Sequence, residues 1–198
     1  MNILLELLLK ILMNLSVCYK YCLKRVSGYC ISKHRVKRHL EATGKGKPMN
    51  IILNQSFEID NLITQSGQFT IIDFQKALMN ISKEYKDYVL NNGEYIITTT
   101  RSIEIIDGEQ LMDTEILLPA NCRIQVEKPY IFKNKIKIAN ALYSKVEDIA
   151  KLQDKLNEVN QYVIDNKFQP ITSAYLVQTK QENKPIIEIY VGLNPNIL

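Results

Sequence analysis

Residues 49–198, three quarters of this sequence, lack histidine and contain a single cysteine, Cys122. Without an imidazole, this part offers no Ser–His or Cys–His pair for nucleophilic catalysis and no histidine-rich metal site. A lone thiol offers no disulfide framework, which is typical of a reducing, cytoplasmic compartment. These absences exclude most hydrolytic and metal-dependent chemistry from residues 49–198, where we expect neither a metal nor a cofactor.

The 198 residues divide into two parts of opposite charge. Residues 1–48 carry ten Lys/Arg and two acids, which gives +8, and residues 49–198 carry fifteen Lys/Arg and nineteen acids, which gives −4. A negative net charge gives no hint of the basic face that nucleic-acid binding needs. We therefore expect one domain over residues 49–198, with no nucleic-acid partner, after a basic leader over residues 1–48.

The basic leader, residues 1–48, allows three functional interpretations. The run "NILLELLLKILMNLSV" is interrupted by Glu6 and Lys10 and is shorter than the ~20 apolar residues of a membrane span. An amphipathic helix on an anionic membrane fits the basic run "CLKRVSGYCISKHRVKRH" better. The cysteines and histidines from Cys18 to His39 could ligate zinc, but they lack the short C-x2-C spacing of most structural sites. Membrane contact is expected only if the leader exists as protein.

A fourth interpretation, which we favour, is that the leader is mistranslated upstream sequence and that the protein begins at Met49. Lys45-Gly46-Lys47 can be encoded as AAA-GGA-AAA, which contains the AAGGA typical of a bacterial ribosome-binding site. The charge and the use of cysteine and histidine change at the same point. N-terminal sequencing of the native protein would decide, because a mature chain that begins at Met1 contradicts this interpretation.

Residues 49–198 contain one pattern of strand, helix, strand, strand twice. In the first copy, residues 54–63 alternate loosely, residues 69–93 have apolar positions three and four apart, and residues 94–105 and 112–119 are β-prone around the turn "IDGEQ". The helix has an apolar stripe formed by Ile71, Phe74, Leu78, Ile81, Tyr85 and Tyr88, and it is stopped by Asn91-Asn92-Gly93. We expect Tyr88 to pack between helix and sheet.

The second copy repeats this order. Residues 124–142 alternate, residues 144–166 form a helix, and residues 171–179 and 186–193 form two strands around the turn "KQENKP". The apolar stripe of this helix comprises Val146, Ile149, Leu152, Leu156, Val159 and Val163.

At the start of the second helix, Ser144 is the expected N-cap, with Glu147 closing a capping box. The two copies together predict an α+β fold with a duplicated strand–helix–strand–strand unit. Their strands would form one curved, mainly antiparallel sheet with two long helices on one face. The concave face between the two copies is the expected position of a ligand.

Two strings carry a resemblance to a known family. "MDTEILLP" closes the first copy, and "AYLVQTKQENKPIIEIYVGL" closes the second with an acid, an aromatic residue and a final "YV". In these strings and in their order, residues 51–194 resemble the GyrI-like small-molecule-binding domain, which is related to BmrR-type effector domains and to SOUL haem proteins. The resemblance implies a stand-alone bacterial binding domain. Haem is not expected, because residues 49–198 supply no histidine ligand.

The resemblance also implies which residues contact the ligand. In the family a cationic or amphipathic ligand lies against aromatic residues, and a glutamate in the strand after the second helix neutralises it. Ser173 stands at that glutamate's position, which argues against a cationic ligand, whereas Tyr175 keeps the aromatic position. Glu188 and Tyr190 share one face of the last strand. The pattern alone allows either the ligand cleft or a solvated face for this pair, and the resemblance favours the cleft.

Residues of the first copy complete the candidate site. Glu115 is the equivalent of Glu188, although the pattern favours a surface carboxylate. Tyr95, Thr99 and Arg101 share a strand face, where Arg101 could bind an anion, although a solvated arginine is favoured. No catalytic or metal-ligating residue is assigned. The ligand-binding candidates are Tyr95, Thr99, Glu115, Ser173, Tyr175, Glu188 and Tyr190.

Three functions follow from these features. The first is a non-catalytic domain that binds a small amphipathic molecule in the cleft between the copies. The first alternative is a protein-interaction or accessory module, for example toxin- or secretion-associated or directed at gyrase, and the absence of glutamate at Ser173 favours it. The second alternative is a small-molecule hydrolase that uses Glu188 with Tyr175 or Tyr190.

Overall fold

The structure, a computed structural model, describes residues 51–89, 95–181 and 184–194. The basic leader lies outside the described residues, and with it the predicted amphipathic helix, the zinc ligands and the start at Met49. The predicted helix stop at residues 91–93 and part of the turn at residues 180–185 also lie outside them.

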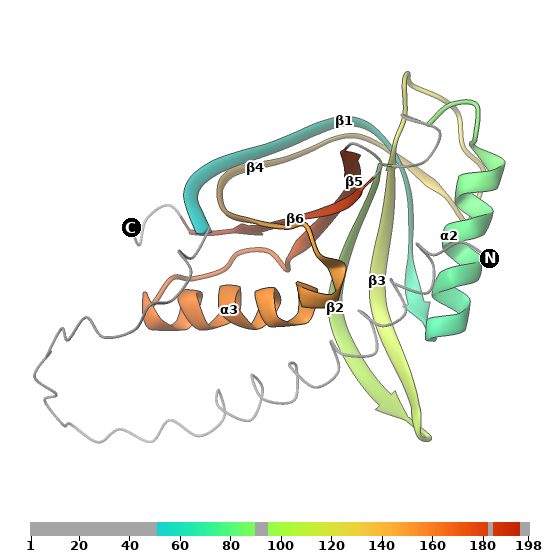
Figure 1. The fold of residues 1–198 in the computed structure, drawn as a ribbon. Coiled ribbons are helices and arrows are strands. Elements are labelled where there is room, and N and C mark those ends of the chain that lie inside the picture. The colour runs from blue at the N-terminus through green and yellow to red at the C-terminus, as the bar shows by residue number, and fades with distance from the viewer. Residues whose placement is uncertain (1–50, 90–94, 182–183, 195–198) are drawn as a thin grey trace, which may run out of the picture.

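The described residues form two successive copies of strand, helix, strand, strand, so the predicted duplication is confirmed (Figure 1). The first copy consists of β1 (Ile51–Phe69), α2 (Ile71–Glu84), β2 (Ile96–Ile106) and β3 (Glu109–Pro119). The second copy consists of β4 (Ile131–Val146), the short 3-10 helix η2 (Ile149–Lys151), α3 (Leu152–Asp165), β5 (Tyr175–Gln181) and β6 (Lys184–Gly192).

The strands form one antiparallel sheet that closes into a barrel in the order β1-β3-β2-β5-β6-β4. Exchanging the two copies gives the same order read backwards, so the topology is twofold symmetric about the pairing of β2 with β5. There Ile97 lies opposite Val177. The barrel closes because β1 and β4 pair from Ile51 opposite Ser144 to Thr64 opposite Ile131. The sequence predicted the curved sheet but not this closure.

A tight turn sets the register of β2 against β3. Asp107 and Gly108 have φ angles of 51° and 83°. Positive φ at both central residues is what a two-residue hairpin loop needs, and Asp-Gly adopts it readily. The resulting register places Thr99 opposite Glu115. It contains one irregularity, between Thr100 and Ser102.

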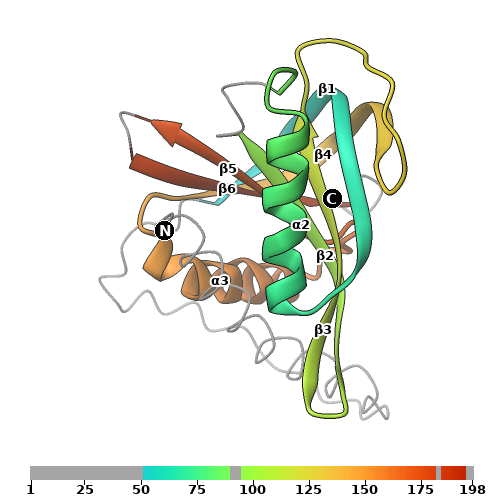
Figure 2. The same ribbon diagram turned by 90° about the vertical axis from the view of Figure 1, so that its right-hand side faces the viewer.

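Both helices pack on the outside of the barrel, as the prediction of two helices on one face requires (Figures 1 and 2). The buried face of α2 packs with outward-facing residues of β1 and β3, such as Ile63 and Ile116, and that of α3 packs with residues of β4 and β6, such as Leu142 and Ile189. Residues on the inner face of strands β1 to β5 form a third cluster inside the barrel. Its buried members are Phe57, Leu62, Ile97, Leu117, Ile138, Ala141 and Val177.

Helix α2 is shorter than predicted. A cap begins it, since the Thr70 hydroxyl accepts a hydrogen bond from the Asp73 N–H at 3.1 Å. The helix ends at Glu84, with Tyr85 as its C-cap residue. Tyr88 therefore lies beyond the helix and is 48% exposed, so the prediction that Tyr88 packs between helix and sheet is wrong. None of the described helices is long and apolar enough to cross a membrane.

The predicted N-cap at Ser144 is also wrong. Ser144 is buried in β4 opposite Ile189, because the alternation of this strand continues to Val146. The Asp148 carboxylate caps η2 instead by accepting a hydrogen bond from the Ala150 N–H at 3.1 Å. Helix α3 follows at Leu152 without a side-chain cap of its own.

Candidate functional site

The inner face of the barrel brings predicted ligand-binding residues of both copies together. Four of them form a row across the sheet. Glu115 on β3 lies opposite Thr99 on β2, Thr99 lies opposite Tyr175 on β5, and Tyr175 lies opposite Tyr190 on β6. Directly opposed residues of antiparallel strands share a face of the sheet. Glu188 shares that face with Tyr190, two residues along β6, so both copies contribute to one surface.

Aromatic rings gather at the β6 end of this row. The rings of Phe57 and Tyr190 stack with their centroids 4.6 Å apart, and the Tyr175 ring lies 6.1 Å from Phe57. The Tyr143 ring packs against Tyr190 at 5.1 Å. We call Phe57, Tyr143, Tyr175 and Tyr190 the aromatic cluster. They lie on β1, β4, β5 and β6, so the cluster assembles only when the barrel closes.

The Glu188 carboxylate lies within the aromatic cluster and accepts hydrogen bonds from two phenols. The Tyr143 hydroxyl donates to Oε1 at 3.1 Å, and the Tyr190 hydroxyl donates to Oε2 at 3.2 Å. Within the described part of the chain, Glu188 forms no ion pair with a lysine or an arginine. Glu188 is therefore a half-buried carboxylate whose partners are neutral hydroxyls.

These phenols stay neutral over the physiological pH range. Burial, and then the negative charge of Glu188, raises the pKa of Tyr95 to about 12. Burial, the charge of Glu188 and the hydrogen bond to it raise the pKa of Tyr143 to about 12. The pKa of Tyr190 is raised by the same causes, burial first. The tyrosines can therefore act as hydrogen-bond donors to a ligand or to Glu188.

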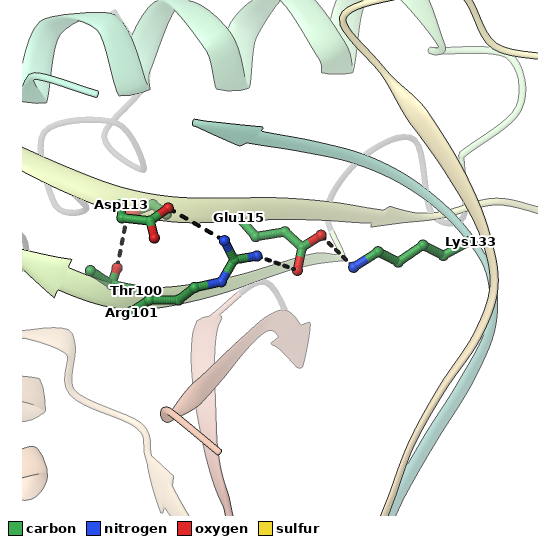
Figure 3. A network of polar contacts seen from close by, with 6 residues as sticks. Thr100, Arg101, Asp113, Glu115 and Lys133 are labelled. Carbon is green, nitrogen blue, oxygen red and sulfur yellow. Dashed lines mark hydrogen bonds and ion pairs between the residues drawn. The ribbon is translucent and has the colours of Figure 1, made fainter. Parts of the chain in front are cut away.

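The second carboxylate of the inner face, Glu115, belongs to an ion network (Figure 3). Lys133 Nζ lies 2.5 Å from Glu115 Oε1, and Arg101 Nη2 lies 3.6 Å from Oε2. The Arg101 guanidinium also contacts Asp113 at 3.4 Å, so it lies between the two carboxylates of β3. Two cations and two acids thus balance one another beside Tyr175.

The ion network corrects two interpretations of the sequence. The Glu115 side chain is only 5% exposed, so it is not a surface carboxylate. Arg101 is half-exposed but ion-paired, so it is not simply a solvated arginine. Burial, with the charge of Glu115 as the next cause, raises the pKa of Tyr175. The charge of Glu115 therefore acts on Tyr175, a member of the aromatic cluster.

Six of the seven predicted ligand-binding residues lie at or beside the aromatic cluster, and the seventh, Ser173, lies outside the strands. Tyr95, Tyr175, Glu188 and Tyr190 lie at the aromatic cluster, and Thr99 and Glu115 lie beside it. Ser173 lies two residues before β5 and makes no hydrogen bond within the described part of the chain.

Sequence reasoning missed Phe57 and Tyr143. Tyr143 fell at the boundary between the predicted strand and the predicted helix, and the alternation Ala141, Tyr143, Lys145 is the signal that could have found it. For Phe57 the signal is its inward position in β1, which only the pairing with β4 defines. No group of three or more His, Cys, Asp or Glu is placed to hold a metal ion among the described residues.

Comparison with known proteins shows a likeness in fold. No protein-family model matches the sequence, and no curated protein matches it. The crystal structure of the EcmrR C-terminal domain is similar, with a TM-score of 0.54 and 21% identity, over 74% of this chain and 99% of that domain. EcmrR in the cryo-EM structure of the EcmrR–DNA complex in EcmrR-RPo is also similar, with a TM-score of 0.57 and 19% identity over 74% of this chain. This chain spans 58% of the length of that EcmrR chain. At these identities the likenesses show that this chain shares its fold with the EcmrR C-terminal domain.

Proposed function

We propose that this protein binds a small amphipathic molecule at the aromatic cluster and does not transform it. The observation that carries the proposal is the half-buried Glu188 carboxylate, which is held by the Tyr143 and Tyr190 hydroxyls beside the stacked Phe57 ring. Aromatic faces and one carboxylate suit a ligand with an apolar ring and a cationic or hydrogen-bond-donating group. Such a mixture of apolar walls and few polar groups is typical of small-molecule sites.

The ligand would lie at the margin of the barrel interior and not at its centre. The seven buried apolar residues of the inner cluster fill the centre. Tyr95, Tyr175, Glu188 and Tyr190 keep partial exposure beside them. A ligand can therefore contact these four residues without the removal of the barrel core.

Glu188 supplies the negative charge that the serine at position 173 cannot provide. Ser173 precedes β5, and Glu188 lies on the neighbouring strand β6, two residues from Tyr190, which is opposite Tyr175. The carboxylate thus reaches the same tyrosines from a different strand. This arrangement restores the option of a cationic group, against which Ser173 argues in the sequence.

Binding is favoured over hydrolysis because both Glu188 oxygens already accept hydrogen bonds from phenols. Each oxygen keeps a second lone pair, so a carboxylate held in this way by neutral phenols is suited to accept a hydrogen bond from a bound ligand. The exposed free thiol of Cys122 agrees with our proposal of a reducing, cytoplasmic compartment.

A matched series of three probes tests the proposal: benzyltrimethylammonium, benzyl alcohol and benzoate. We expect the cation to raise the melting temperature most and benzoate least, because a ligand that binds only the native state stabilises it. Since the chain has no tryptophan and eleven tyrosines, binding should also change tyrosine fluorescence.

Glu188→Gln should abolish the preference for the cation and keep the fold, and Glu147→Gln, at an exposed position, should leave the preference unchanged. The proposal fails if none of the three probes changes the melting temperature or the fluorescence at millimolar concentration.

A further inference from the structure

The hairpin of β2 and β3 extends beyond the barrel and leaves one side of β2 open (Figures 1 and 2). β2 pairs with β3 as far as Ile106, but it pairs with β5 only from Ile96 to Thr99. In the described part of the chain, no strand lies on the other side of residues 102–106. We call residues 102–106 the hairpin edge.

The hairpin edge has less protection than most open strands, because Glu104 is the single charged residue among residues 102–106. An unpaired edge presents backbone N–H and C=O groups that can pair with another strand. Proteins commonly protect such edges with lysine, proline or a covering segment. Here Ile105 is 53% exposed and Ile106 is 45% exposed, and no lysine or proline occurs in residues 102–106. The edge is therefore both apolar and accessible.

The charged residues of the segment 102–112 all have one sign. Residues 102–112 contain three exposed acids, Glu104, Asp107 and Glu109, and no lysine or arginine. The register places Ile103 and Ile105 on one face of β2, with Glu104 on the other. A strand added beside β2 would therefore meet Ile103 and Ile105 on one face, and Glu104 with the exposed Ile106 on the other.

We propose that the hairpin edge binds an extended segment of a partner protein in which basic and apolar residues alternate. The segment adds to the sheet as a strand beside β2, so main-chain hydrogen bonds supply affinity and the alternating side chains supply selectivity. Its basic residues meet Glu104, and its apolar residues pack beside Ile103 and Ile105. This surface is separate from the aromatic cluster and does not depend on the proposed ligand.

A second copy of this chain fits the hairpin edge less well. Pairing two such edges would bring the acidic hairpins, each with Glu104, Asp107 and Glu109, close together. Like charges that face each other across strands are destabilising. The charge of the hairpin therefore favours a basic partner over self-association.

Three synthetic peptides of about six residues, the usual length of a strand, test the proposal. The first alternates lysine and valine, the second is the same peptide N-methylated at every other residue, and the third alternates glutamate and valine. In ¹⁵N-labelled protein we expect the first peptide to shift and protect amides of residues 102–106, and the other two to leave them unchanged.

Glu104→Lys should weaken binding of the lysine–valine peptide by about fivefold, from the upper range for cross-strand charge pairs. Glu147→Lys, at an exposed position after β4, should leave it unchanged. Equal binding of the N-methylated peptide, or no shift at residues 102–106 with millimolar peptide, would overturn the proposal. So would shifts at the same amides on concentrating the protein alone, because they would assign the edge to a second copy.

Discussion

Replacement of Lys133 by methionine tests how strongly the buried Glu115 carboxylate depends on its cation. Lys133 Nζ lies 2.5 Å from Glu115 Oε1, and the Glu115 side chain is 5% exposed. Removing one partner of a fully buried ion pair costs roughly 3–5 kcal/mol. Because Lys133 is 38% exposed and Arg101 remains at 3.6 Å, we expect Lys133→Met to lower the free energy of unfolding by about 2 kcal/mol.

Lys135→Met is the matched control. Lys135 Nζ also lies 2.5 Å from a carboxylate oxygen, Oε1 of Glu58, but the Glu58 side chain is 38% exposed. Water can solvate Glu58 after the lysine is removed, so Lys135→Met should change stability much less than Lys133→Met. Each carboxylate keeps a second cation, Lys137 at 3.1 Å from Glu58 and Arg101 at 3.6 Å from Glu115, but only Glu115 is buried.

Urea denaturation of Lys133→Met, Glu115→Gln and the double variant completes a thermodynamic cycle. Glu115→Gln alone should cost about 1 kcal/mol, since Lys133 can still be hydrated. The double variant should cost at least about 1 kcal/mol less than the sum of the single changes, because it leaves no buried charge. Additive costs, or equal costs for Lys133→Met and Lys135→Met, would refute the reasoning.

Further predictions concern the tyrosines, a close contact and the core. Because the pKa values of Tyr95 and Tyr143 are about 12 in the folded protein, folding favours their neutral forms. The resulting stability is present below a pH of about 10 and is lost as the pH rises toward 12. In an alkaline spectrophotometric titration, these tyrosines should ionise at higher pH in the folded protein than in the urea-unfolded protein. Gly192→Ala should lower stability by about 1–3 kcal/mol in urea denaturation, because the added Cβ would lie 3.0 Å from the Thr172 side chain. Leu152→Ala, at a fully buried position, should cost about 3 kcal/mol by the same assay, and a cost below 1 kcal/mol would contradict its place in the core.

Local patterns of the sequence were enough to predict most of the elements. Apolar spacings of three and four indicated both helices, and the Asp107-Gly108 turn indicated the hairpin of β2 and β3. The alternation of β6 placed Glu188 and Tyr190 on one face, and in the structure Ile187 and Ile189 lie on the opposite face, in the cluster with α3. Each of these signals depends on residues that are close together in the sequence, so it can be recognised without knowledge of the fold.

The boundary of the second helix shows where local patterns failed. Ser144 and Glu147 have the spacing of a capping box, yet Ser144 lies in β4 because pairing with β6 extends the strand. That pairing joins residues more than forty positions apart, and no local propensity reports it. The same error removed Tyr143 from the predicted strand and therefore from the predicted site.

By itself, the sequence determined the two copies of strand, helix, strand, strand and, through alternation, that Tyr95 shares a strand face with Thr99 and Glu188 shares one with Tyr190. Only the tertiary structure decided that the sheet closes through β1 and β4, that Phe57 and Tyr143 join the tyrosines, and that Glu115 is buried against Lys133. The physical reason is that side-chain alternation is a property of one strand, whereas closure, stacking and burial of charge depend on which strands become neighbours.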